Sequence, residues 1–374
     1  MKLHINRLIF LLLALGAVSC EKEVKVKGLD TGKYLIINAM LDDADSVHTV
    51  YLSWSDDSGV SLPKGAEVTL SVNGSPQRQE SFGEGSSANI YRFRATIQSG
   101  DVIRIDARYG HTLAYAEVTV PQKPVFSLVD TLRCPRPETT IYLGESDRIV
   151  EFILKVKDIP GESSRYRLTL ERDFRKVAQF ETGREDELIF PRPDSVYVKS
   201  ERLNFDIGSD PILLDDYLPE SYGDYGINDI IGDFNPHNVQ KVFSDKKFTD
   251  SEAEVKFYVD SLSFVTRSDF IDYWKWETGY DAYGNIINQK HYVSYDADIY
   301  PTARVRLHSL SQDAYDYCRA LNACEVFGYS ANPLTEPVIF PTNVEGGLGI
   351  VSAESSAELL IPFPAFRSDL RRSH

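Results

Sequence analysis

The chain has 374 residues, of which 42% are hydrophobic, 11% aromatic and 26% charged, and this composition excludes a mainly disordered protein. Its 56 acidic and 40 basic residues give a formal net charge of −16, which argues against a broad nucleic-acid-binding surface and against electrostatic attraction to an anionic lipid surface. The 21 Tyr and 19 Phe, beside only 2 Met, favour a β-rich fold over a helical bundle.

The chain begins with the features of an export signal. Lys2 and Arg7 precede an apolar run over residues 8–18, and small residues follow. This run is too short for a membrane-spanning helix, which needs about 20 residues, and no later stretch is long and apolar enough. We therefore expect residues 1–19 to form a signal peptide, residues 20–32 to form a linker, and the mature chain to lack a transmembrane helix.

The segment Ala17-Val18-Ser19-Cys20 resembles a bacterial lipobox, in which the cysteine thiol is lipidated before cleavage leaves it as the first residue. Each buried methylene contributes roughly 0.8 kcal/mol, so several acyl chains, such as palmitate, on one cysteine make a durable anchor. An ordinary signal peptide in which Cys20 is incidental is the alternative. The sequence thus predicts a lipidation site at Cys20 and contact with the membrane through that anchor only.

Three cysteines remain in the mature chain, too few and too scattered for a disulfide framework. At most one pair can form within the chain. Cys318 and Cys324 can be bridged only if a helix ends between them, and Cys134 paired with either of them is the other candidate. We interpret all three as small buried side chains.

Residues 33–120 alternate apolar and polar positions with a period of two, in short runs separated by turn-forming residues. This pattern predicts an immunoglobulin-like β-sandwich over residues 33–120. Pro121 and Pro124 end the unit, because a central strand does not tolerate them. The expected strands are 33–41, 47–54, 66–73, 89–96, 101–108 and 112–119.

Residues 125–366 are expected to form a larger β-rich domain with one short C-terminal helix. The run 151–171, with turn formers at 158–161, reads as a hairpin, and residues 208–233 read as a long loop or lid. Ser309 and Gln312 fit a capping box, so they predict a helix that continues to Asn322. Further strands are expected at 125–132, 240–243, 254–264, 291–295 and 303–307.

Six segments, taken in order along the chain, carry a family resemblance. They are Ser19–Glu23, Lys64–Leu70, Asp158–Tyr166, Phe243–Asp245, Leu310–Tyr317, and Asn332–Leu334 through Thr342–Ile350. In this order they resemble the domain-of-unknown-function family 4249, whose members are Bacteroidetes lipoproteins, over most of the mature chain. The resemblance implies an exported outer-membrane lipoprotein, often encoded near TonB-dependent outer-membrane receptors, and it implies no catalytic residue.

The last of these segments is rich in glycine. Gly346, Gly347 and Gly349 allow positive φ angles and a close approach of the backbone to its neighbours. We interpret them as a tight structural turn, with a ligand-binding loop as the alternative.

The common signatures of catalytic and metal sites are absent from the sequence: no zinc-ligand spacing, nucleophile elbow or P-loop is present. The sequence therefore predicts no enzyme, no cofactor and no metal site. A Ser/His/Asp site assembled only by the fold stays open. The acid groups Asp42-Asp43 with Asp45, and Asp296 with Asp298, read as solvated surface acids in preference to calcium ligands.

The best candidate for a binding site is a group of four aromatic residues: Trp274, Trp276, Tyr280 and Tyr283. Exposed aromatic side chains among polar residues can stack on sugar rings or anchor a protein partner. The alternative is a long hairpin in which Trp274 and Trp276 share one face against the core.

We therefore expect an accessory or binding protein of unknown ligand, lipid-anchored on the periplasmic or the cell-surface face of the outer membrane. A TonB-dependent receptor is the candidate partner, and no binding to nucleic acid is expected. A surface adhesin or glycan-binding lipoprotein is the first alternative. A hydrolase is less favoured, since it requires a histidine and a carboxylate to converge on a serine in a deep pocket.

Overall fold

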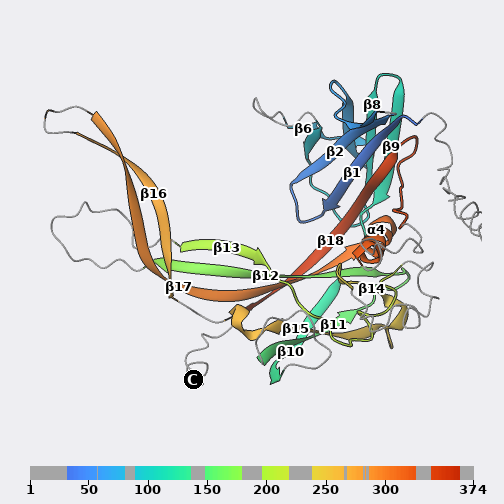
Figure 1. The fold of residues 1–374 in the computed structure, drawn as a ribbon. Helices are drawn as coiled ribbons and strands as arrows, with labels where there is room; N and C mark the ends of the chain where they lie inside the picture. Colours follow the sequence, from blue (N-terminus) through green and yellow to red (C-terminus); the bar gives the residue numbers. More distant parts are fainter. Residues whose placement is uncertain are drawn as a thin grey trace, which may run out of the picture.

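The computed structural model describes residues 32–56, 58–80, 89–135, 148–178, 196–218, 238–264, 268–280, 283, 286–325 and 338–362. Within these residues the chain is mainly β with one α-helix, as predicted (Figure 1). None of the described helices is long and apolar enough to cross a membrane.

The four longest of the first nine strands follow the alternation in the sequence, whereas the three shortest are exposed at every position. In β1, for example, every second residue from Leu35 to Leu41 is buried, because the odd positions face one side of the sheet. The nine strands are β1 (Tyr34–Asp42), β2 (Val47–Asp56), β3 (Gly59–Ser61), β4 (Glu67–Val72), β5 (Ser75–Pro76), β6 (Arg78–Gln79), β7 (Ile90–Arg94), β8 (Val102–Tyr109) and β9 (Thr112–Thr119).

The remaining described elements are also mostly strands, some of them long. They are β10 (Val125–Pro135), β11 (Arg148–Lys157), β12 (Arg165–Ala178), β13 (Val196–Arg202), β14 (Val242–Ser244), the 3₁₀ turn η1 (Asp245–Lys247), β15 (Glu252–Asp260), the 3₁₀ turn η2 (Ser261–Phe264), β16 (Ser268–Tyr280), β17 (Ile286–Leu310), α4 (Gln312–Ala323) and β18 (Leu348–Pro362).

One sheet runs through the whole body in the order β13-β12-β17-β18-β1-β2-β7-β6. Strand β18 joins its two halves: residues 348–354 pair in parallel with β1, and residues 354–362 pair antiparallel with β17. The predicted boundary at Pro121–Pro124 separates β9 from β10, but the sheet crosses between the two predicted domains through β18.

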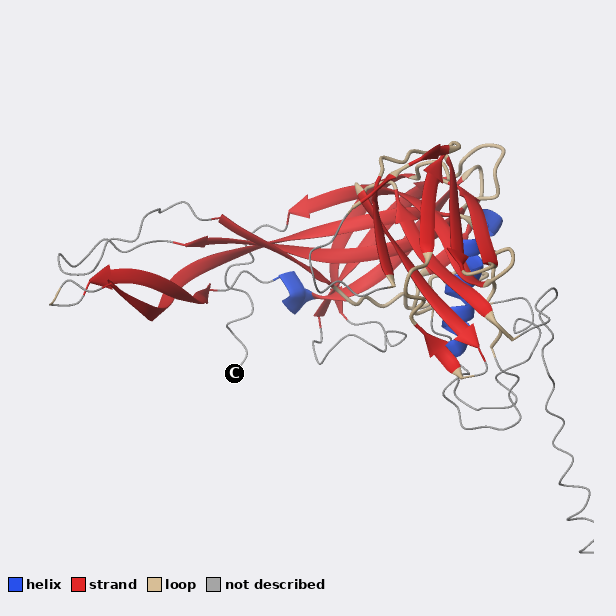
Figure 2. Cartoon of the chain, turned by 90° about the horizontal axis from the view of Figure 1, so that it is seen from above, coloured by secondary structure: helices blue, strands red, loops and turns tan. Residues whose placement is uncertain are grey.

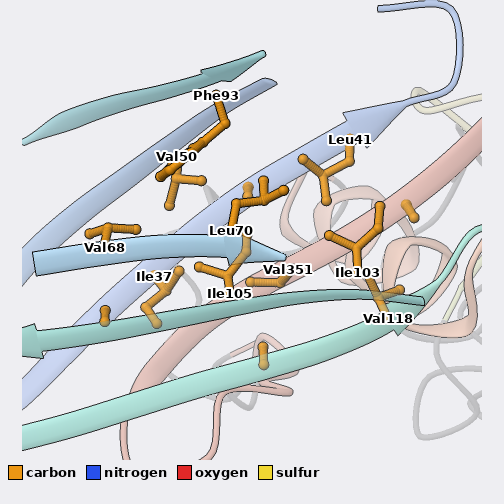
Figure 3. Packing of buried hydrophobic residues seen from close by; sticks show 14 of the residues in the cluster. Ile37, Leu41, Val50, Val68, Leu70, Phe93, Ile103, Ile105, Val118 and Val351 are labelled. Atoms are coloured by element: carbon orange, nitrogen blue, oxygen red, sulfur yellow. The ribbon is translucent and has the colours of Figure 1, made fainter. Parts of the chain in front are cut away.

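The first half of the long sheet packs against a four-stranded sheet, β5-β4-β8-β9, to form a β-sandwich. Its core includes Ile37 of β1, Leu70 of β4 and Ile105 of β8, all fully buried. Val351 of β18 lies among them (Figure 3), as does Val344 just before that strand. The predicted sandwich is therefore completed by residues more than two hundred positions downstream.

The second half of the long sheet packs against a three-stranded sheet, β10-β11-β15. The predicted hairpin over residues 151–171 is wrong, because β11 pairs with β10 and β15 whereas β12 belongs to the long sheet. The apolar faces of β11 and β12, with Phe152 and Leu168 at 0% and 1% exposure, meet across the second core instead. Short-range alternation predicts which face is buried but not which strand is the neighbour.

The glycine-rich segment carries the chain from one sheet of the first sandwich to the other. Glu345 bridges to Tyr115 of β9, and residues from 348 onward pair with β1. A Cβ at Gly347 would lie 2.5 Å from the carbonyl oxygen of Leu35, and Gly349 has a φ of +108° beside the carbonyl of Ile37. These contacts fit the structural turn that the sequence predicts.

The predicted helix is present, but its start differs. Helix α4 begins at Gln312, and Ser311 is the N-cap, whose side chain accepts a hydrogen bond from the backbone N–H of Ala314. The predicted capping box with Ser309 is wrong, because Ser309 still belongs to β17. A long strand thus continues two residues further than the capping pattern indicates.

The three described cysteines are free thiols, so no disulfide joins them. Cys318 on α4 is buried, as predicted, whereas Cys134 and Cys324 are partly exposed.

Candidate functional site

A long two-stranded arm extends from the body of the protein (Figures 1 and 2). It consists of β16 and residues 286–298 of β17, paired antiparallel from Ser268–Asp298 to Tyr280–Ile286. On its other edge β17 is paired with β12 only from Ala297 onward. Beyond that point the arm is supported by no third described strand, over a length of about 40 Å.

The arm is rich in aromatic residues. Positions 268–298 hold eight of them, including two of the three Trp of the chain. The backbone of Trp274, Trp276 and Tyr280 lies in β16, opposite Tyr292, Lys290 and Ile286, which fits the predicted long hairpin; the side chains of Trp274, Trp276 and Tyr280 lie outside the described part of the structure.

Tyr283 occupies the tip of the arm and is 90% exposed. Ile286, the first residue of β17, is 65% exposed. The sequence thus predicted one aromatic residue that the fold presents to solvent. The other predicted site residue, Cys20, lies outside the described residues.

A second candidate site is a buried polar cluster on the long sheet. Four neighbouring strands, β12, β17, β18 and β1, bring Arg167, His308, Glu354 and Asp42 together, because Arg167 is opposite His308 and Asp42 is opposite Glu354 in the strand register. The side chains are 14%, 6%, 11% and 20% exposed in that order. Helix α4 packs over this part of the sheet and places its buried Cys318 there.

Hydrogen bonds fix the two carboxylates of the cluster in place. The Arg167 guanidinium donates to both carboxylate oxygens of Glu354, at 2.9 and 2.7 Å. Asp42 Oδ1 accepts hydrogen bonds from the backbone N–H of Ala44 at 2.9 Å and from the Ser356 hydroxyl at 3.2 Å. These bonds leave Asp42 Oδ2 facing the imidazole.

His308 is partnered on one side of its ring only. Its Nε2 lies 3.0 Å from the Thr169 hydroxyl. Its Nδ1 lies 3.5 Å from Glu354 Oε1 and 3.7 Å from Asp42 Oδ2, and it makes no aligned hydrogen bond within the described structure. One imidazole nitrogen and two carboxylate oxygens therefore converge on one point.

The two carboxylates differ in acidity. Burial raises the pKa of Asp42, and the neighbouring Glu354 adds to this increase. Burial also opposes ionisation of Glu354, but His308 and the Arg167 charge outweigh it and lower the pKa of Glu354 below its usual value. The cluster therefore favours a negative charge on Glu354 more than on Asp42.

The prediction that Asp42 and Asp43 are solvated surface acids is wrong. The Asp43 side chain is 6% exposed; it lies 3.1 Å from Lys123 Nζ and accepts a hydrogen bond from the Ser356 N–H. Asp45 is exposed, as predicted, and Asp296 and Asp298 have side chains outside the described part of the structure. Asp42 and Asp43 are covered because β18 pairs with the end of β1, which no local pattern reveals.

The hydrolase alternative requires a hydroxyl next to an imidazole that in turn lies next to a carboxylate. The cluster contains these three kinds of group in that spatial order. The hydroxyl nearest the imidazole belongs to Thr169, however, and the Ser356 hydroxyl donates to Asp42 instead. Within the described residues Nδ1 of His308 makes no aligned hydrogen bond, so the cluster as described lacks the carboxylate–imidazole hydrogen bond of a catalytic triad.

A shallow depression of about 480 Å³ opens on the outer face of the β4–β8–β9 sheet, lined in part by Leu113, Tyr115 and Glu345. The Arg104 guanidinium lies 4.0 Å from the centroid of the Tyr115 ring and 2.8 Å from Asp106 Oδ1. Because this cation is already paired, the depression is a weaker candidate than the arm or the cluster.

Comparison with known families gives a match over most of the chain. The family model described as Domain of unknown function (DUF4249) matches residues 21–359. A comparison with curated proteins gives no match.

Proposed function

We propose that this chain, which belongs to the DUF4249 family, is a lipid-anchored outer-membrane accessory protein that binds a partner through its β16–β17 arm and catalyses no reaction. The partner class that we propose is a TonB-dependent outer-membrane receptor. The lipobox-like sequence that ends at Cys20 supports the anchor, and the net charge of −16 argues against a nucleic acid as partner.

The single observation that carries the binding role is the unsupported arm. A two-stranded hairpin is at best marginally stable in water on its own, and this one continues past the last described strand that pairs with it. Its exposed tip carries Tyr283 and Ile286, and aromatic side chains are frequent anchors in protein interfaces. An arm of this kind is stabilised when a partner covers it.

Pull-down from the native outer membrane in mild detergent tests the proposal. In an arm-shortened variant, residues 272–294 are replaced by Asn-Gly, which joins the cross-strand neighbours Ile271 and Tyr295 by a two-residue turn. We expect the wild type to recover a β-barrel receptor, the arm-shortened variant to lose it, and Tyr283→Ala to weaken it. Cys20→Ala should move the protein out of the membrane fraction.

Tyr51→Ala is the matched control, since Tyr51 is 48% exposed on the first sandwich, away from the arm. It should leave receptor recovery unchanged. Equal recovery by the wild type and the arm-shortened variant would exclude the arm as the contact. A membrane-bound protein that recovers no receptor but binds glycans would favour the glycan-binding alternative.

A further inference from the structure

We propose that Asp42, His308 and Glu354 bind a divalent transition-metal ion of the zinc type, and that this ion fastens the first sandwich to the second. The three donor atoms that would hold it all lie within 4.8 Å of one another. They come from β1, β17 and β18, so the site exists only where the long sheet crosses from one sandwich to the other.

The donor geometry supports a cation at this point. Nδ1 of His308 lies 3.5 and 3.7 Å from one oxygen of each carboxylate, and ligand atoms about 2 Å from a shared ion are separated by distances of this order. The imidazole is 94% buried and its Nδ1 has no hydrogen-bond partner in the described structure. Three atoms whose lone pairs converge in a buried site repel one another unless a cation or a proton lies between them.

Each of the three ligand side chains also contacts a further residue that fixes its orientation, as is usual for ligands in metal sites. The Thr169 hydroxyl lies 3.0 Å from Nε2 of His308, and where it accepts the Nε2 proton the lone pair of the neutral ring is on Nδ1. Asp42 Oδ1 is bound by Ala44 and Ser356. Glu354 Oε2 is bound by Arg167, which also reaches Oε1.

The donor set selects the class of ion. One imidazole nitrogen with two carboxylate oxygens suits zinc and its neighbours, whereas calcium and magnesium prefer oxygen ligands alone and larger ligand numbers. The charges of the two ionised carboxylates equal that of a divalent ion, and the Arg167 guanidinium beside Glu354 gives the filled site a net charge of +1. The nearby thiol of Cys318 is not among the three donors.

Metal titration of the full chain tests the site. The chain is stripped with a chelator, dialysed, and titrated with Zn²⁺, and bound metal is counted by elemental mass spectrometry. We expect one equivalent per chain, a rise in the melting temperature on adding Zn²⁺, and binding of Ca²⁺ at least about 100-fold weaker. Asp42→Asn and His308→Gln should each lower the Zn²⁺ affinity at least about 100-fold, and Thr169→Val about tenfold.

His48→Gln is the control for the loss of a buried histidine. His48 is 2% exposed, and its Nδ1 also has no hydrogen-bond partner among the described residues. Its Nε2, however, lies 3.2 Å from the carbonyl oxygen of Ala95, and His48 belongs to no described group of metal donors. This variant should retain one equivalent of Zn²⁺. X-ray absorption of the loaded wild type should show only nitrogen and oxygen ligands at about 2.0–2.2 Å, a readout that does not depend on whether the ligand variants fold.

The proposal is overturned if the wild type binds no stoichiometric metal, because the imidazole then holds a proton in place of an ion. It is equally overturned if folded Asp42→Asn and His308→Gln variants bind Zn²⁺ as the wild type does, or if sulfur appears among the ligands.

Discussion

Gly349 lies at the point where β18 first runs beside β1, and two separate constraints exclude a side chain there. Its φ is +108°, and a Cβ would overlap the carbonyl oxygen of Ile37. Gly59 has nearly the same φ, +110°, with no atom within 4 Å of its Cβ position. Gly349→Ala should therefore lower the free energy of unfolding by at least about 3 kcal/mol, and Gly59→Ala by about 1–2 kcal/mol, from backbone strain alone. Urea denaturation measures both; equal losses would contradict the close approach.

Lys241 is a half-buried cation whose titration can be followed. Burial lowers its pKa from 10.5 to about 8, although the charge of Asp206 opposes this, and its Nζ lies 5.3 Å from the centroid of the Phe205 ring. Because the folded state releases this proton at lower pH than the unfolded state, Lys241 makes the free energy of unfolding increase between about pH 8 and 10.5, by at most about 3 kcal/mol.

The Lys241→Met variant should lose that increase and be more stable than the wild type near pH 7, since it buries no charge. Urea denaturation of both proteins at pH 7, 8, 9 and 10 gives the difference between them, which removes the contributions of other titrating groups. Two parallel pH profiles would show that Lys241 is solvated.

At the scale of single residues, the sequence predicted the exposed aromatic residue of the arm but not the buried polar cluster. Tyr283 was predicted as one of a group of aromatic residues among polar ones, and the structure places it in a turn between two strands, 90% exposed. The cluster of Asp42, His308 and Glu354 was missed, because its members are separated by more than 260 and by 46 positions and meet only through strand pairing. The one local signal was a pair of acids, Asp42-Asp43, at the end of an apolar strand.

Among the elements, α4 depends on a single side chain at its start. The Ser311 hydroxyl accepts from the N–H of Ala314 at 3.3 Å and from the N–H of Ala353 at 3.3 Å, so it caps the helix and ties it to β18. Ser311→Ala should lower the free energy of unfolding by about 1–2 kcal/mol. Ser309 is buried with no described hydrogen-bond partner for its hydroxyl, so Ser309→Ala should change stability by less than about 0.5 kcal/mol. If thermal denaturation showed a larger loss of stability for Ser309→Ala than for Ser311→Ala, Ser309 would be the N-cap instead.

The elements themselves were largely predictable, and their partners were not. Strands β1, β2, β4, β8 and β9 lie within two residues of their predicted bounds, because alternation reports one buried face. The same alternation assigned β11 and β12 to one hairpin, although they lie in different sheets. A period of two contains no information on whether the next strand returns beside the first or crosses the core.

For the whole molecule, the order of strands in the long sheet implies a single folding unit. Strand β18 contributes Val351 and Ala353 to the first core and packs Ile361 against the second, so neither sandwich is complete without it. The prolines at residues 121–124 suggest two domains that fold separately. The sequence around them gives no sign of β18, the strand that joins the two sandwiches, because it lies more than 200 residues further along the chain.

This architecture predicts one cooperative thermal transition. Unfolding the first sandwich removes β1 from its pairing with β18, and β18 also pairs with β17 of the second sandwich. Loss of the first sandwich therefore destabilises the second as well. Scanning calorimetry should give a ratio of calorimetric to van't Hoff enthalpy near one. Gly349→Ala, although it lies in the first sandwich, should move that whole transition to lower temperature. Two resolved transitions, of which the variant shifts only one, would instead show that the sandwiches unfold independently despite their shared strand.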